Sequence, residues 1–304
     1  MPETVERCPL CGSTQSTIFD QRMFHEQAVT NRLCSNCGLV YQSPRMNEDE
    51  MGAFYEREYR QLYQGQEGPG SKDLAVQESR AESLLSFAKP HLSGVSRHLD
   101  IGCSAGLLLR RFRDNYACQS TGVEPGEAYR NFTQAQGFTV YSSLDELQTG
   151  VATSAAHPDQ AETGRFDLIS MIHVLEHLTN PVEYLSDLRE NTLTGDGWFL
   201  IEVPNLYCHD CFEVAHTVSF SEQTLAQTLK KAGFVIMASL QHGQPRSELH
   251  PLYLTTLARP AKTTRRFQLE PERGVKRKRQ LGLLRRRILT RLYPKQAWIR
   301  TQNS

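Results

Sequence analysis

The sequence has no apolar run approaching the roughly 18 residues that a membrane-spanning helix needs. Its first residues, MPETVERCPLCG, include no apolar segment of the kind that marks a secretory signal. No internal repeat is visible. The 304 residues are 39% hydrophobic and 22% charged, which argues against wholesale disorder, a collagen-like repeat and a coiled coil. We therefore expect a cytoplasmic protein with one sizeable α/β domain and a small appendage.

A net charge of zero conceals an uneven distribution. Residues 262–304 contain 14 Lys or Arg and 2 Asp or Glu, so this tail carries +12 and residues 1–261 carry −12. Within the tail, residues 281–293 alternate leucines with arginines and are typical of a basic amphipathic helix. Such a tail is either a solvated extension or a contact for an anionic partner: an anionic membrane surface, a nucleic acid or the acidic body. Contact with a membrane would make the protein peripheral to the inner membrane.

The eight cysteines are grouped, and two of the groups predict a metal site. In a cytosolic protein, Cys-x2-Cys pairs indicate metal or redox chemistry rather than disulfides. A glycine follows each of the first two pairs, as in zinc knuckles, where it permits the turn toward the thiolate. We expect residues 1–45 to form a two-hairpin zinc ribbon that depends on structural Zn²⁺ for folding. The expected ligands are Cys8, Cys11, Cys34 and Cys37.

The other cysteines give weaker indications. Cys208 and Cys211 enclose a histidine and an aspartate, but their spacing is incomplete for a four-cysteine site, and incidental cysteines are the simpler interpretation. Cys103 falls in a glycine-rich loop, and Cys118 is expected to pack in the core.

Apolar segments alternate with amphipathic ones through the rest of the chain. This alternation predicts a mostly parallel sheet covered on both faces. Strands are expected at 96–101, 119–123, 138–141, 166–172, 198–203, 234–241 and 252–258, and helices at 73–92, 107–115, 181–190 and 221–232. The polar segment 148–165 is expected to be a loop. The expected domains are a zinc ribbon (1–45), a helical linker or lid (46–95), a cofactor-binding domain (96–261) and the basic tail (262–304).

The segment HLDIGCSAG lies where the first expected strand meets its helix. Glycines there allow a ligand to approach the backbone closely, and the helix N-terminus favours a polar or anionic group. The next strand ends in Glu124, about 20 residues later, where a carboxylate can accept hydrogen bonds from ribose hydroxyls. A nicotinamide dinucleotide is the alternative ligand, but its sites usually require a third glycine that this loop lacks.

Together with GVEP, FDLISMIHVLEHLTNP, WFLIEVPN and HTVSFSEQTL, this segment resembles the class I S-adenosylmethionine-dependent methyltransferases, in particular bacterial enzymes of sugar and polysaccharide biosynthesis. Several of those share the CxxCG…CxxCGLVYQSPR…FYEREY pattern. The resemblance covers roughly residues 5–258. It implies a Rossmann-like seven-stranded sheet of order 3-2-1-4-5-7-6 with the last strand antiparallel. The cofactor residues it implies are Asp100, Gly102, Ser104, Gly106, Glu124 and His173, with Ser104 standing where the family usually has glycine.

Candidate catalytic residues follow two of the strands. His173, Glu176 and His177 follow the fourth strand and lie on one face of a turn. His216 resembles a recurrent histidine of this family and is the preferred general base, ahead of His177 and His173. Packing or backbone contacts are the structural alternative for these histidines.

Three functions stay open at this point. The first is methyl transfer to oxygen or carbon of a sugar or glycan-linked acceptor, so the expected partner is a small-molecule or glycan acceptor. The second is RNA methylation, with docking through the ribbon and the tail, although the ribbon has few basic residues. The third is a cofactor-binding scaffold without catalysis. The segment after the fourth strand lacks the Asn/Asp-Pro-Pro-aromatic motif common in enzymes that methylate planar nitrogens, which disfavours nucleobase methylation.

Overall fold

The structure is a computed structural model that describes residues 2–57, 68–154, 164–210, 212–262 and 267–299. The chain divides into two compact units. One unit comprises Met1–Met51, His173–Asp187 and Ile201–Arg300, and the other comprises Gly52–Ile172, Leu188–Leu200 and Thr301–Ser304. The cysteine-rich N-terminus and the basic helix of the tail therefore belong to one unit, and the glycine-rich loop belongs to the other.

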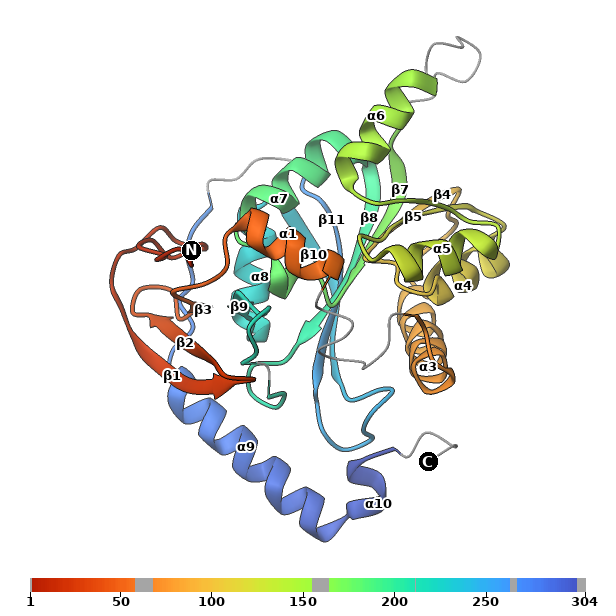
Figure 1. The fold of residues 1–304 in the computed structure, drawn as a ribbon. Coiled ribbons are helices and arrows are strands. Elements are labelled where there is room, and N and C mark those ends of the chain that lie inside the picture. The colour runs from red at the N-terminus through yellow and green to blue at the C-terminus, as the bar shows by residue number, and fades with distance from the viewer. Residues whose placement is uncertain (1, 58–67, 155–163, 211, 263–266, 300–304) are drawn as a thin grey trace. The chain divides into compact units, whose positions relative to one another are not determined.

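Seven strands form the larger sheet, in the order β10-β11-β8-β7-β4-β5-β6 (Figure 1). Parallel pairing joins β4 to β5 and β7, and β5 to β6, whereas β10 and β11 are antiparallel. Read from the other edge and numbered along the chain, this is the expected order 3-2-1-4-5-7-6, so the predicted fold class is confirmed. The strands are β4 (Arg97–Ile101), β5 (Gln119–Val123), β6 (Thr139–Tyr141), β7 (Phe166–Ile172), β8 (Leu193–Pro204), β10 (Phe234–His242) and β11 (Tyr253–Pro260).

Strand β7 shows why the centre of the sheet was readable from the sequence. Its seven residues, FDLISMI, are buried almost throughout, as expected for a strand covered on both faces. Its parallel register with β4 pairs Ile101 with Met171. The loop that begins at Gly102 therefore leaves β4 at the carboxyl ends of these strands, the edge where ligands bind in such sheets.

The four helices whose limits were expected begin and end within four residues of those limits. The helices of the structure are α1 (Glu48–Arg57), α3 (Ser71–Ala88), α4 (Leu107–Tyr116), α5 (Glu127–Ala135), α6 (Leu144–Ser154), α7 (Pro181–Asp187), α8 (Glu222–Lys231), α9 (Val275–Leu292) and α10 (Pro294–Ala297). A capping box starts α8: the Ser221 hydroxyl accepts from the Thr224 amide, and the Thr224 hydroxyl accepts from the Ser221 amide. The helix ends before Gly233, whose φ is 87°.

One expectation was wrong in part. Residues 148–154, assigned to a loop because they are polar, form the second half of α6. The Ser143 hydroxyl accepts from the Glu146 amide and caps the helix, and two acidic residues in the first turn suit the positive end of the helix dipole. The rest of that expected loop, residues 155–163, lies outside the described residues.

The N-terminal module forms a second sheet of order β1-β2-β3-β9. Three of its strands are close in sequence: β1 (Ser16–Phe24), β2 (Gln27–Cys34) and β3 (Val40–Gln42). The fourth, β9 (Val218–Ser219), lies more than 170 residues further along the chain and pairs antiparallel with β3. The ribbon is therefore completed by a strand that the pattern of residues 1–45 does not contain.

No described helix is both long enough and sufficiently apolar to cross a membrane.

We expect Ser221→Ala to lower the free energy of unfolding by about 1–2 kcal/mol, because it removes the cap of α8. The Ser221 hydroxyl is fully buried and also donates to Glu272 (2.9 Å), so the change leaves that carboxylate without one partner. Urea unfolding followed by circular dichroism measures the effect. The exposed Ser35→Ala serves as the control, and equal midpoints for the two variants would contradict the assignment.

Candidate functional site

The glycine-rich loop between β4 and α4 alternates its backbone conformation. Gly102, Ser104 and Gly106 all have positive φ, at 75°, 49° and 75°. Ser104 therefore keeps the conformation that glycine usually supplies, at a strain of about 1–2 kcal/mol. Gly106 has a steric reason as well, since a Cβ there would lie 2.6 Å from the Thr133 methyl group. The replacement of glycine by serine thus leaves the left-handed path of the loop intact.

Glu124 at the end of β5 ties this loop to the next strand. Its Oε2 accepts from the Ser104 amide (2.9 Å), and its Oε1 accepts from the Gly126 amide (3.0 Å). The residue is buried, and each carboxylate oxygen can accept more than one hydrogen bond. A carboxylate held this way at the end of the second strand fits the ribose of an adenosine cofactor. The residues present therefore suit S-adenosylmethionine.

Asp100 lies at the base of the loop in a buried polar chain. The Ser170 hydroxyl donates to Asp100 Oδ1 (2.6 Å) and lies 2.8 Å from His98 Nε2. Since this hydroxyl has one proton, His98 Nε2 must be the donor in the second contact. Burial lowers the pKa of His98 to about 3, so its ring is neutral, and burial raises the pKa of Asp100 to about 7.

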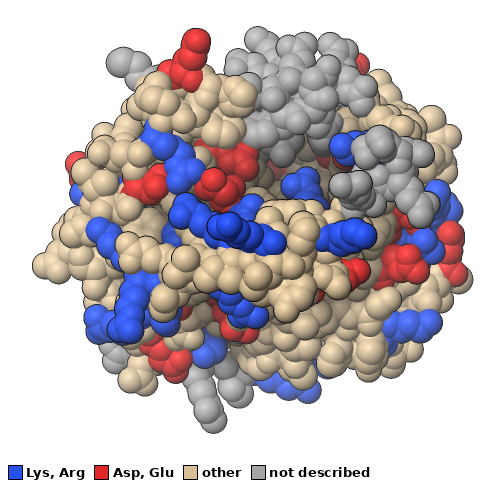
Figure 2. Space-filling view, turned by 90° about the horizontal axis from the view of Figure 1, so that it is seen from below, with Lys and Arg blue, Asp and Glu red and all other residues tan. Residues whose placement is uncertain are grey.

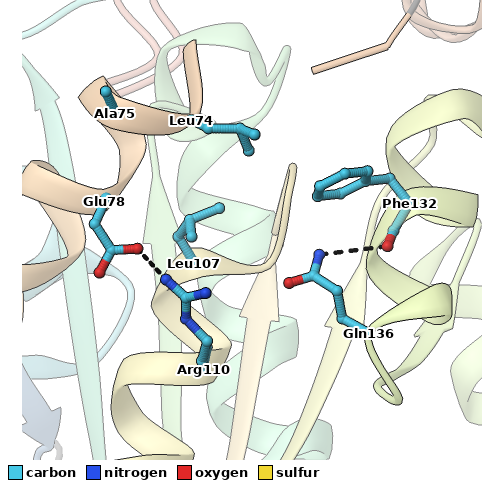
Figure 3. A pocket seen from close by; sticks show the side chains of 7 residues that line it. All are labelled: Leu74, Ala75, Glu78, Leu107, Arg110, Phe132 and Gln136. Carbon is cyan, nitrogen blue, oxygen red and sulfur yellow. Dashed lines mark hydrogen bonds and ion pairs between the residues drawn. The ribbon is translucent and has the colours of Figure 1, made fainter. Parts of the chain in front are cut away.

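A cavity of about 310 Å³ lies between α3, α4 and α5 (Figure 3). Its described lining is Leu74, Ala75, Glu78, Leu107, Arg110, Phe132 and Gln136, which includes none of the expected cofactor residues. Gln136 also donates to the Ala105 carbonyl (3.1 Å), so the helices that form this cavity support the back of the glycine-rich loop.

The four predicted metal ligands meet in the N-terminal module. The sulfur atoms of Cys8 and Cys37 are 3.5 Å apart, as are those of Cys11 and Cys34, and all four lie within 4.8 Å of one another. A tetrahedral zinc site with bonds of about 2.3 Å has sulfurs roughly 3.8 Å apart. The set therefore has the dimensions and the chemistry of a structural zinc site.

Both knuckles show the turn that their glycines predict. The amide of Gly12 donates to the Cys8 carbonyl (2.8 Å), and the amide of Gly38 donates to the Cys34 carbonyl (3.0 Å). Both glycines have positive φ. A Cβ at Gly38 would collide with the backbone of Glu272, whose amide donates to the Cys37 carbonyl (2.9 Å). The start of the tail is thus packed on the second knuckle.

A second cluster combines Glu176, His177 and His216, all buried. One side-chain ligand atom from each lies within 4.8 Å of the others, a donor set that suits either proton transfer or a transition metal. The imidazole rings of His177 and His216 have centroids 4.8 Å apart. Two of the three expected catalytic histidines are therefore brought together in the same unit, beside a carboxylate.

Hydrogen bonding determines how His177 is protonated. Its Nδ1 lies 3.0 Å from the Ala215 carbonyl, which can only accept, so Nδ1 carries the proton. Burial lowers the pKa of His177 to about 4, so the ring is neutral at pH 7 and Nε2 keeps its lone pair. Burial opposes the ionisation of Glu176, but the His173 contact and the neighbouring imidazoles outweigh it and lower its pKa to about 2.

His173 bridges two buried carboxylates. Its Nε2 lies 3.1 Å from Glu202 Oε1, and its Nδ1 lies 3.3 Å from Glu176 Oε1. Its φ of 57° is strained for a histidine, by about 1–3 kcal/mol, and its amide donates to the Glu202 carbonyl (2.9 Å). The surrounding contacts therefore impose this conformation.

Glu202 is a site residue that the sequence analysis missed. It is fully buried on β8, and its Oε2 accepts from Thr255 (2.7 Å) and lies 3.1 Å from His242 Nε2. The available signal was an acidic residue inside the apolar strand WFLIEVPN, since a charge is rarely buried without partners.

The ribbon is connected to the histidine cluster through the segment after His216. The Thr217 hydroxyl donates to the Leu178 carbonyl (2.6 Å), which holds this segment against the turn that carries Glu176 and His177. The Thr217 carbonyl accepts from the Gln42 amide of β3 (2.8 Å). Arg45 of the ribbon donates to the Thr179 carbonyl (2.8 Å). The N-terminal module thus supports both segments that supply the cluster.

Cys208, from the third cysteine pair, and Asn205, which directly follows β8, have structural contacts. Cys208 is buried against Leu252, Tyr253 and Trp298, and Cys211 lies outside the described residues. Asn205 caps the turn after β8, since its Oδ1 accepts from the Tyr207 amide (3.0 Å).

Comparison with known proteins places the chain in a family. The family described as "Methyltransferase domain" matches residues 74–239, more than half of the chain. The chain belongs to this family. The expected class, an S-adenosylmethionine-dependent methyltransferase, is confirmed at the level of family and fold.

Two curated relatives match shorter segments. The ubiquinone biosynthesis O-methyltransferase of Marinobacter nauticus is 30% identical over 104 residues, which are 34% of this chain and 42% of the relative. The tRNA U34 carboxymethyltransferase of Idiomarina loihiensis is 30% identical over 115 residues, which are 37% of this chain and 35% of the relative. The matched segments thus span less than half of either relative.

A solved structure is similar over a longer range. The 1,6-didemethyltoxoflavin-N1-methyltransferase of Burkholderia thailandensis, determined with S-adenosylhomocysteine bound, superposes with a TM-score of 0.55. The match covers 80% of this chain and 100% of that one at 18% identity, so it shows a shared fold.

We expect Glu124→Gln to weaken S-adenosylmethionine binding by at least roughly tenfold, because one carboxylate oxygen becomes an amide nitrogen that cannot accept. Isothermal titration calorimetry measures the affinity. The exposed Glu127→Gln, on the adjacent helix α5, is the control. An unchanged affinity in a folded Glu124→Gln protein would remove Glu124 from the cofactor site.

Proposed function

We propose that this chain is an S-adenosylmethionine-dependent methyltransferase that modifies oxygen or carbon of a sugar or glycan-linked acceptor, with His216 as the general base. The observation that carries the proposal is the buried cluster of Glu176, His177 and His216. Methylation of a hydroxyl group releases a proton, which a base must accept near neutral pH. Histidines beside a buried carboxylate supply that chemistry.

The proposed reaction is a direct displacement. When bound beside Glu124 and the glycine-rich loop, S-adenosylmethionine would supply a methyl group on a positively charged sulfur, activated for in-line displacement. The His216 imidazole takes the acceptor proton. The Glu176 carboxylate stabilises the imidazolium that forms at His216. His177, fixed by its hydrogen bond to the Ala215 carbonyl, packs against the His216 ring and keeps it in position.

RNA methylation is the second candidate, and the tRNA-modifying relative is the observation that favours it. The ribbon gives it little support, because its arginines are already engaged. The Arg22 guanidinium pairs with Asp20 (2.7 Å) and Asp210 (2.8 Å) and lies over the Phe212 ring, and Arg32 donates to Ser16 (2.8 Å). These side chains are therefore poorly placed to bind phosphates. A cofactor-binding scaffold without catalysis is the third candidate, and it would leave the buried base unused.

We also propose that the four-cysteine set holds one structural zinc ion. Metal binding would stabilise a module whose own core is too small to support it. Through the β3–β9 pairing, the same ion would hold the segment that carries His216.

We expect His216→Ala to lower kcat by about a hundredfold or more while leaving S-adenosylmethionine affinity unchanged, as loss of a general base does. Radiolabelled methyl transfer is measured on nucleotide sugars, lipid-linked saccharides and tRNA, with the exposed His91→Ala as control. Normal turnover in His216→Ala would exclude it as the base. Methylation of tRNA alone would replace the sugar proposal with the second candidate, and cofactor binding without any transfer would favour the scaffold.

We expect purified protein to contain about one zinc per chain, and Cys34→Ser to lose it. The variant should also lose kcat more than cofactor affinity, because the ribbon supports the histidine cluster and the glycine-rich loop belongs to the other unit. Mass spectrometry of the metal and calorimetry with S-adenosylmethionine give the two readouts. The control is Cys118→Ser, a buried cysteine outside the set, and retained zinc in Cys34→Ser would show that the ligand assignment is wrong.

A further inference from the structure

Helix α9 packs on the protein with its polar side. Arg279 is buried, donates to the carbonyls of Leu206 and His209 and lies 4.2 Å from the centroid of the Phe212 ring. One turn of the helix further, Gly282 is packed against the Tyr207 carbonyl, where a Cβ would collide. Arg286 donates to the Cys208 carbonyl (2.8 Å) and lies over Trp298. Arginine-to-carbonyl hydrogen bonds thus hold the middle of the helix.

The apolar side of the same helix faces outward. Leu281, Leu284, Ile288 and Leu292 are between 49% and 62% exposed, and Tyr293 directly follows with 51%. At 3.6 residues per turn, the four aliphatic residues fall within about 80° of the helix circumference. Half of the large hydrophobic residues that are exposed in the described part of the chain lie on this one segment. This orientation is the reverse of an ordinary surface helix, which buries its apolar stripe.

Lys and Arg side chains lie on both sides of the aliphatic stripe that these four residues form. By helical position, Lys278 and Arg285 flank one edge, and Arg287 and Arg291 flank the other. The helix has eight Lys or Arg and no acidic residue in VKRKRQLGLLRRRILTRL. Among the described residues, Arg285, Arg287 and Arg291 make no ion pair. Viewed from the side on which α9 lies, Lys and Arg side chains border a band of uncharged surface (Figure 2).

We propose that the outer face of α9 binds the surface of an anionic membrane. An aliphatic stripe of this width can enter the boundary between headgroups and acyl chains, while arginines on both edges reach the lipid phosphates. The helix would lie in the plane of the surface and hold the rest of its unit beside it. This function is independent of the zinc, cofactor and histidine residues, none of which lies on α9.

Charge complementarity favours a lipid surface over other occupants of the stripe. A second copy of the chain would bring two such helices, each with eight cations and no acidic residue, into contact at close range. A nucleic acid would use the arginines but would leave the leucines exposed to water. An anionic membrane satisfies both the charges and the apolar stripe.

Vesicle sedimentation with the full chain tests the proposal. We expect binding to vesicles of phosphatidylcholine with 30% phosphatidylglycerol, and little binding to phosphatidylcholine alone. Leu284→Gln/Ile288→Gln should lower the partition coefficient by at least about tenfold, because the stripe loses half of its aliphatic residues. Arg285→Gln/Arg287→Gln should lower it by roughly thirtyfold, and added salt should weaken binding of the parent. All four changed side chains are exposed, so the variants should fold, which circular dichroism checks.

The control replaces two exposed methionines outside the helix, Met23→Gln/Met237→Gln, and should bind like the parent. Absence of binding to the anionic vesicles would overturn the proposal, as would equal binding of the leucine variant and the parent. Light scattering that shows a dimer dispersed by Leu284→Gln/Ile288→Gln, without vesicle binding, would assign the stripe to a second copy. Binding of tRNA that depends on the arginines alone, without vesicle binding, would assign the helix to nucleic acid. Unchanged methyl transfer to a soluble acceptor in both variants is expected, which separates this surface from catalysis.

Discussion

The backbone pairing of β3 with β9 is the constraint on which the ribbon and the histidine cluster both depend. It joins Val40 to Ser219 and Tyr41 to Val218, and Gln42 extends it to Thr217. The module that contributes β3 carries four cysteines and is too small to fold on apolar burial alone. The segment that contributes β9 begins directly after His216, because Thr217 already bonds to Gln42. The cysteine module and a candidate catalytic residue are therefore stabilised by the same few hydrogen bonds.

The unit that contains the ribbon and the histidine cluster must also keep two carboxylates buried. Glu176 and Glu202 are almost inaccessible to water, and an isolated buried charge costs several kcal/mol. His173 lies between them, and other histidines and Thr255 complete their surroundings. This explains why a strained backbone is tolerated at His173: its ring contacts both carboxylates at once. Loss of the His173 ring would leave the carboxylates of Glu176 and Glu202 with fewer partners. We therefore expect this group of carboxylates and histidines to be sensitive to substitution.

Much of the larger sheet could be predicted because its signals are local. The limits of β7 follow from a short apolar run, and the capping box of α8 is contained in four residues. The four cysteine ligands were also local, as two repeated motifs. The remaining features of the fold and the site depend on contacts between segments that are distant in sequence. The hydrophobic periodicity of a single segment does not encode such contacts. Strand β9 is two residues long and acquires its structure from β3, and Glu202 becomes a site residue only where histidines from other segments surround it. Helix α9 was expected from its composition, but the inward direction of its arginines was not.

The distant origin of β9 has a consequence for synthesis on the ribosome. At about 5–20 residues per second, Ser219 is added roughly 10–35 seconds after its partner Val40. During that interval the N-terminal segment is exposed with an unpaired strand edge, the kind of edge that promotes aggregation. The cysteine knuckles, which are complete by Cys37, can close earlier because both motifs belong to the nascent part of the chain. Early capture of the proposed zinc ion would thus protect the N-terminal module of each newly made molecule until β9, the last strand of the ribbon, is synthesised.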